Sequence, residues 1–174
     1  AHGFLDGEYF KGYIDAARLL AERFMKPQPK APGTGMLVGD CGGIYGEYVQ
    51  TLSKLLTHFS LRVTAHFPSF LSLEALEKAS SASLIIVLGR RAEDARQKML
   101  IELAEDIGRR FDMPVFGDLY PIGFQKTLAW LRRLGEVTGN REAADRAIAA
   151  EEAAFEAAIA AGRTHLAGTK TVFC

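Results

Sequence analysis

Short apolar runs and helically spaced apolar faces alternate along the chain. The runs predict four strands, at Met36–Val38, Leu61–Phe67, Ser83–Leu88 and Met113–Phe116. The run Ser83–Leu88 is the most apolar of them. We therefore expect it near the centre of a sheet, where a parallel strand is buried on both faces.

Helical spacing of apolar residues predicts helices before, between and after these strands. Their expected ranges are residues 6–25, 45–59, 72–78, 93–110, 124–134 and 140–166. Asp6, Ser72 and Asn140 are expected N-caps, and Gly168 fits a C-cap. The alternation predicts an α/β fold: a three-layer Rossmann-like domain with a mainly parallel four-stranded sheet and helices on both faces.

The chain divides into three predicted regions. Residues 1–34 hold the first helix and a linker, because residues 26–34 contain three prolines. Residues 35–139 form the Rossmann-like domain. Residues 140–174 form a long C-terminal helix that leads to the first strand of a following, missing domain. We therefore expect a fragment of a longer subunit.

Composition narrows the possible partners. The 174 residues are 48% hydrophobic and 24% charged, and 21 basic residues balance 21 acidic ones. A net charge of zero argues against a nucleic-acid partner. No apolar run approaches the ~20 residues that span a bilayer, and no signal peptide is evident, so we expect no membrane partner. Two cysteines are too few for a disulfide framework, which favours a reducing, cytoplasmic location.

The turn after the first predicted strand is the strongest candidate binding site. Cys41, Gly42, Gly43 and Tyr45 lie between that strand and the next helix. Helix amides point outward at such a turn, and glycines let a ligand approach the backbone. The dinucleotide fingerprint fits poorly, because Cys41 occupies the position of its second glycine. A purely structural strand-to-helix turn is the alternative.

Cys41 also has a chemical interpretation of its own. A thiol near a helix N-terminus has a lowered pKa, which suits metal ligation or nucleophilic attack. His66 ends the second predicted strand and could face the same crevice as Cys41, although no third group is positioned by the sequence. The alternatives are a half-buried cysteine and a partly exposed edge histidine. No second ligand stands at metal-binding spacing, so we expect no metal site.

Arg90 and Arg91 follow the most apolar strand. Two arginines at the carboxyl end of a central strand are well placed to hold an anionic ligand. The alternative is that they begin the next helix and pair with Glu93 and Asp94.

Taken in order, the segments resemble the nitrogenase component 1 family, as the middle domain of a molybdenum-iron protein-like subunit. The segments that carry this resemblance are Leu37–Asp40, Leu73–Val87, Phe111–Pro114, Pro121–Gly123 with Thr127 and Leu131, Leu134–Gly139 and Leu166–Lys170. The resemblance covers essentially the whole chain. One departure is Gly89, which lies near the position of a cluster-ligating cysteine in cofactor-holding subunits.

The resemblance implies an oxidoreductase parent, with nitrogen fixation among the family's activities. Such a parent receives electrons from an iron protein through an iron–sulfur cluster, reduces a small or tetrapyrrole substrate and pairs with a homologous subunit in a hetero-oligomer. This domain would form one wall of the cavity, with cofactor contacts at Cys41, Gly42, Gly43, Tyr45, Arg90 and Arg91. The fragment itself would hold no cofactor and be catalytically inactive.

Two other classes of function fit the same residues. A flavodoxin-like module could hold a small anion at this edge without redox chemistry. A packing domain in a hetero-oligomer would expose a large apolar surface where other domains are missing.

Overall fold

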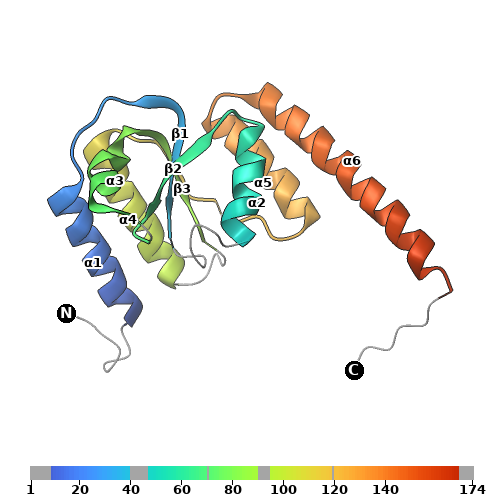
Figure 1. Ribbon diagram of the computed structural model, residues 1–174, viewed down its shortest axis with the longest axis horizontal. Coiled ribbons are helices and arrows are strands. Elements are labelled where there is room, and N and C mark those ends of the chain that lie inside the picture. The colour runs from blue at the N-terminus through green and yellow to red at the C-terminus, as the bar shows by residue number, and fades with distance from the viewer. Residues whose placement is uncertain (1–8, 40–46, 70, 90–94, 119, 169–174) are drawn as a thin grey trace. The chain divides into compact units, whose positions relative to one another are not determined.

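The protein is described from a computed structural model, which covers residues 9–39, 47–69, 71–89, 95–118 and 120–168 (Figure 1). Two compact units make up the chain, Ala1–Pro121 and Ile122–Cys174. The elements of the first unit are α1 (Tyr9–Phe24), β1 (Ala31–Val38), α2 (Glu47–Thr57), β2 (Arg62–Phe67), α3 (Leu73–Lys78), a 3₁₀ turn (Ala79–Ser81), β3 (Ala82–Val87), α4 (Ala95–Phe111) and β4 (Val115–Phe116). The second unit holds α5 (Phe124–Val137) and α6 (Arg141–Leu166).

The sheet is parallel throughout its described strands. Its order is β2-β1-β3-β4, so β1 and β3 are the interior strands. This confirms the predicted α/β fold and the central place of the run beginning at Ser83. Its residues are buried on both faces, apart from the half-buried Ser83, which is why the strand lacks polar alternation.

The two faces of the sheet carry different helices. Met36, Val38, Ile85 and Val87 point to the face that packs against α1 and α4. Right-handed crossovers place α3 and α4 on that face and α2 on the other, because the chain reverses its direction of travel along the sheet after β2. Figure 1 shows this division, with α1, α3 and α4 on one side of the strands and α2 on the other.

Strand β1 begins earlier than the sequence predicted. We expected a linker over residues 26–34, but the strand starts at Ala31. The pairing of β1 with β3 is irregular between Ala31 and Gly35. There the Ser83 hydroxyl donates to the Thr34 carbonyl at 2.7 Å, and the Thr34 amide donates to the same hydroxyl at 3.3 Å. Side-chain hydrogen bonds thus bridge a bulge in which Pro32 cannot donate to a regular ladder.

Further ties hold the amino-terminal edge of the sheet. The Lys30 ammonium donates to the carbonyls of Ser80 at 2.9 Å and Phe111 at 2.6 Å. The Ser80 hydroxyl donates to the Lys26 carbonyl. Burial lowers the pKa of Lys30, and the nearby Asp112 carboxylate partly opposes that shift. These bonds join β1, the end of α4 and the turn before β3.

Helix α1 presents a narrow core face. Ile14, Ala17 and Ala21 are buried, whereas Tyr9 is 63% exposed and Leu20 is also exposed. At about 100° per residue, Tyr9 and Leu20 lie on other sides of the helix from Ile14. Their apolar character therefore did not mark the buried face.

The second unit is a pair of helices joined by a short turn. The Asn140 side chain accepts from the Ala143 amide at 3.1 Å, which confirms the predicted N-cap of α6. A Cβ at Gly135 would lie 2.6 Å from the Ala144 Cβ, so the helices touch through small residues there. Gly168 has φ +78°, which suits the predicted C-cap.

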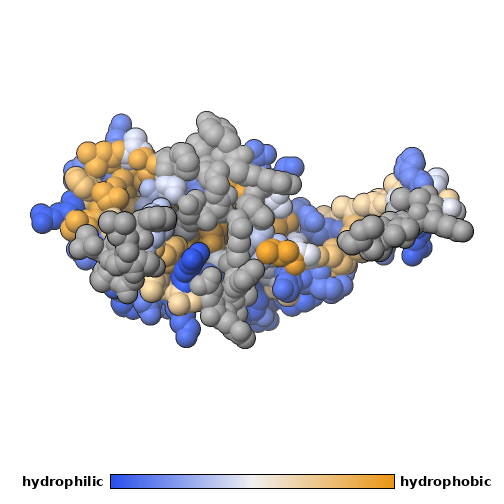
Figure 2. All heavy atoms as spheres, turned by 90° about the horizontal axis from the view of Figure 1, so that it is seen from below, coloured by the Kyte–Doolittle hydropathy of each residue, from blue (hydrophilic) through white to orange (hydrophobic). Residues whose placement is uncertain are grey.

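Beyond its first two turns, α6 is largely exposed. Phe155 stacks on Phe124 with ring centroids 4.0 Å apart, and alanines dominate the rest of this stretch. Figure 2 shows pale orange surface alternating with blue along this helix. Although α6 has 26 residues, neither it nor any other described helix is long and apolar enough to cross a membrane. The predicted cap Asp6 and the predicted strand at residues 170–174 lie outside the described residues.

Candidate functional site

The strand order creates a switch point between β1 and β3. From β1 the chain goes outward to β2, and from β3 it goes the opposite way to β4. Their carboxyl ends are side by side, since the Leu88 amide donates to the Val38 carbonyl at 2.8 Å. The helices that follow these strands lie on opposite faces, and such a switch point is where open α/β sheets bind ligands. Gly39 and Gly89, which precede the predicted contact residues, lie at this edge.

Gly39 is packed closely against Leu88 and has a backbone conformation that other residues rarely adopt. Its φ is +135°, and a Cβ there would lie 3.1 Å from the Leu88 Cβ and 3.2 Å from the Leu88 carbonyl oxygen. Its amide donates to the Phe67 carbonyl at 2.9 Å. Gly39, the first glycine of the predicted turn, therefore contacts the ends of the adjacent strands β2 and β3 from the end of β1. Such close backbone packing is a structural role for this glycine.

His66 is buried, not the partly exposed edge residue that we expected. Its side chain is 3% exposed, because it packs against the end of the neighbouring strand β1. Its Nε2 lies 3.1 Å from the Gly39 carbonyl oxygen. A carbonyl only accepts, so Nε2 carries the proton in this hydrogen bond. The histidine thus fixes the start of the glycine turn.

Gly89 makes room for a side chain that the sequence analysis missed. A Cβ at Gly89 would lie 1.5 Å from Gln97 Oε1 and 1.9 Å from Gln97 Nε2. The Gly89 carbonyl accepts from the Tyr120 amide at 2.6 Å, which holds the end of β3 in place. The amide of Gln97, from the first turn of α4, therefore rests directly on the backbone at the switch point.

Gln97 is 4% exposed, and its Nε2 has no hydrogen-bond partner among the residues that the structure describes. The sequence did contain a signal for it. The buried positions Leu100, Ala104, Ile107 and Phe111 follow helical spacing, and Gln97 continues that spacing toward the N-terminus. It is a polar residue on a core stripe, and a buried polar residue is the informative departure from an apolar core.

The predicted contact residues cannot be placed. Cys41, Gly42, Gly43, Tyr45, Arg90 and Arg91 all lie outside the described residues, and so does the possible pairing of Cys41 with His66. They stay predictions.

The part of the chain that the structure describes contains no set of side chains that could ligate a metal cluster. No group of three or more His, Cys, Asp or Glu side chains there could hold a metal ion. Both cysteines, Cys41 and Cys174, lie outside that part. The described residues therefore do not fit an iron–sulfur cluster.

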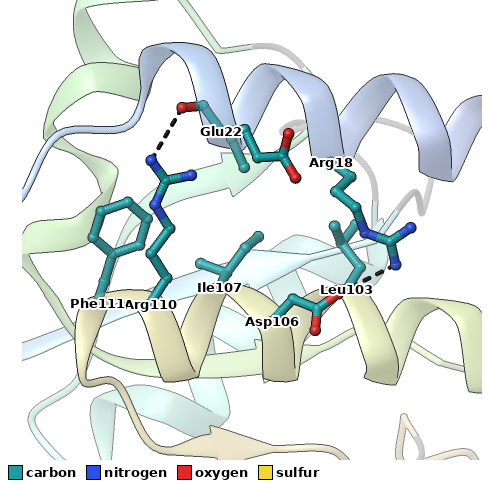
Figure 3. A pocket seen from close by; sticks show the side chains of 8 residues that line it. Arg18, Glu22, Leu103, Asp106, Ile107, Arg110 and Phe111 are labelled. Atoms are coloured by element: carbon teal, nitrogen blue, oxygen red, sulfur yellow. Dashed lines mark hydrogen bonds and ion pairs between the residues drawn. The ribbon is translucent and has the colours of Figure 1, made fainter.

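A hollow lies between α1 and α4. It measures about 140 Å³ and has an apolar floor that includes Leu103 and Ile107 (Figure 3). Three charged side chains on its rim are engaged with the protein: Arg18 pairs with Asp106 at 3.2 Å, and Arg110 donates to the Glu22 backbone carbonyl at 3.1 Å. It is lined by the carboxyl-terminal half of α4, whereas Gln97 is in the first turn of that helix. This hollow is therefore separate from the switch point.

Comparison with known proteins identifies the family. No curated protein matches the chain. The family model of the nitrogenase component 1 type oxidoreductases matches residues 1–174. That range includes every segment on which the resemblance was based and the whole doubly wound sheet with its switch point. The chain belongs to the nitrogenase component 1 type oxidoreductase family.

Proposed function

We propose that the chain is part of an oxidoreductase subunit that reduces a small or tetrapyrrole substrate with electrons from an iron protein. The switch-point edge of its sheet forms one wall of the cofactor and substrate cavity. The observation that carries this proposal is the family match over residues 1–174. The adjacent carboxyl ends of β1 and β3 support it, because ligands bind at that place in this class of sheet.

Members of the family generally bind metal clusters and assemble with an iron protein partner. In our proposal the iron–sulfur cluster is held by parts of the parent other than the described residues. When bound, that cluster supplies electrons. A homologous subunit completes a hetero-oligomer in the cytoplasm, and the chain on its own is inactive.

The chain's own residues shape and hold the wall. Gly39, His66 and Leu88 form a buried floor in which the backbone groups named above are paired with one another. This floor fixes the positions of Gly39 and Gly89, which directly precede residues 40–46 and 90–94. In the proposal, Cys41, Gly42, Gly43 and Tyr45 after β1, and Arg90 and Arg91 after β3, contact the cofactor or substrate.

The test is anaerobic purification of the full-length protein with its partner subunit. We expect visible absorption from an iron–sulfur cluster, and bleaching of that absorption when a reduced iron protein and ATP are added. A colourless protein that accepts no electrons contradicts the proposal. If such a protein binds small anions at this edge, the flavodoxin-like binding module replaces it.

A further inference from the structure

Among the described residues at the carboxyl edge of the sheet, Gln97 carries a polar group that the fold does not use. Gln97 is 4% exposed, and its Nε2 has no hydrogen-bond partner in the described part of the chain. Leaving such a donor unpaired costs about 1–3 kcal/mol. A buried polar group that the fold leaves unpaired needs an explanation, and a bound ligand or an ordered water is the usual one.

The neighbouring backbone is built around this side chain. Any Cβ at Gly89 would collide with the Gln97 amide, at 1.5–1.9 Å from its three terminal heavy atoms. Only glycine at the end of β3 therefore leaves the amide where it is. The residue pair places an unused N–H donor at the switch point between β1 and β3, and not at an arbitrary place in the core.

The chemistry around the donor favours an anion. Gln97 is in the first turn of α4, a helix of 17 residues. The N-terminus of a helix carries partial positive charge and backbone N–H groups without intrahelical acceptors. An acceptor that meets both the Gln97 amide and this helix end is best satisfied by negatively charged oxygen.

We propose that Gln97 is a ligand-contact residue whose side-chain amide donates to an oxyanion, a carboxylate or phosphate group of the small molecule held at the switch point. This inference rests on the proposed function, in which this edge faces a ligand cavity, and it names the chemistry of the group recognised there. Gly89 is the accompanying positioning residue.

The test uses the full-length protein and two probes, succinate and inorganic phosphate, titrated by calorimetry. We expect one of them to bind, and Gln97→Leu to weaken its binding at least about tenfold, the effect of losing one hydrogen bond to a charged group. Gln125→Leu is the matched control, because Gln125 is an exposed glutamine in the first turn of α5. We expect its affinity to stay within about twofold of wild type.

A second measurement separates a ligand contact from a structural water. Without added oxyanion, Gln97→Leu and the longer Gln97→Met are expected to unfold at or above the wild-type temperature, because they remove an unpaired buried donor. A lower unfolding temperature in both variants, or failure of both to fold, overturns the inference, since the amide is then satisfied by a structural water. It is also overturned if neither oxyanion binds wild type, or if Gln97→Leu binds as wild type does.

Failure of the inference is distinct from failure of the proposed function. A protein with a reducible cluster whose oxyanion binding ignores Gln97 overturns the inference alone. A protein without a cluster whose oxyanion binding depends on Gln97 overturns the oxidoreductase proposal and keeps the ligand contact.

Discussion

The two edges of the sheet use polar groups in opposite ways. At the amino-terminal edge, Lys30, Ser80 and Ser83 each donate to backbone carbonyls and tie neighbouring segments together. At the carboxyl-terminal edge, Gly39 and Gly89 follow the two interior strands, and the buried Nε2 of Gln97 has no partner among the described residues. The first edge is organised for stability. The second keeps a close-packed backbone but leaves a donor unused, as a binding edge does.

The largest expected effect is at the amino-terminal edge. Gly108→Ala would place a Cβ 2.7 Å from the Met113 carbonyl oxygen and 2.8 Å from Val115 Cγ2. Because a backbone atom cannot swing aside, we expect a loss of about 3 kcal/mol in the free energy of unfolding, measured by urea denaturation. Gly162→Ala is the control: nothing lies within 4 Å of its Cβ, so it should stabilise α6 by about 0.5–1 kcal/mol. Equal effects of the two substitutions would show that this edge is not tightly packed.

Next comes the bulge between β1 and β3. Ser83→Ala removes the hydroxyl that donates to the Thr34 carbonyl and accepts from the Thr34 amide. We expect a loss of about 1–3 kcal/mol in the free energy of unfolding, because Thr34 is buried and water cannot replace both bonds. Ser53→Ala, on α2, should change the free energy by less than about 0.5 kcal/mol. A Ser83 variant as stable as wild type would mean that the bulge closes without the hydroxyl.

The carboxyl-terminal edge is examined by a double-mutant cycle. Gly89→Ala forces the Gln97 side chain out of its place, and we expect a loss of about 1 kcal/mol. In the Gln97→Ala background the same substitution should cost less, with a coupling energy of at least about 0.5 kcal/mol. Thermal and urea unfolding of the four proteins give this coupling. Additive effects would show that Gly89 is not reserved for Gln97.

The smallest effect is expected on a solvent-exposed helix away from either edge. Lys78 lies 2.7 Å from Glu74 across one turn of α3, and its hydrogen bond to the carboxylate lowers the pKa of Glu74. A depressed carboxyl pKa stabilises the fold above the unfolded pKa, and this contribution disappears as the pH falls through the folded value. Lys78→Met should raise the Glu74 pKa toward its ordinary value in an NMR titration and leave the unfolding temperature unchanged. A clear drop in that temperature would contradict the expectation that an exposed ion pair away from both edges adds little to stability.

Local chemistry made several elements predictable from the sequence. Ser72 and Asn140 cap their helices as expected, because a side-chain oxygen needs only the amide three residues ahead. The apolar composition of the run Ser83–Leu88 was enough to predict an interior strand. The order of such segments also supported the family resemblance that the comparison confirmed.

Other features depended on residues far away in the sequence. The three prolines in residues 26–34 led us to predict a linker, but pairing with β3 starts strand β1 at Ala31. We expected His66 to be a partly exposed edge residue. The structure instead buries it against the Gly39 carbonyl oxygen, at the end of the neighbouring strand β1.

The sequence by itself determined the alternation of elements, two helix caps and the family. Only the tertiary structure decided that Gln97 is a buried donor resting on Gly89. Capping and periodicity are properties of neighbouring residues, whereas the burial of a polar group depends on which strand end the fold brings against it.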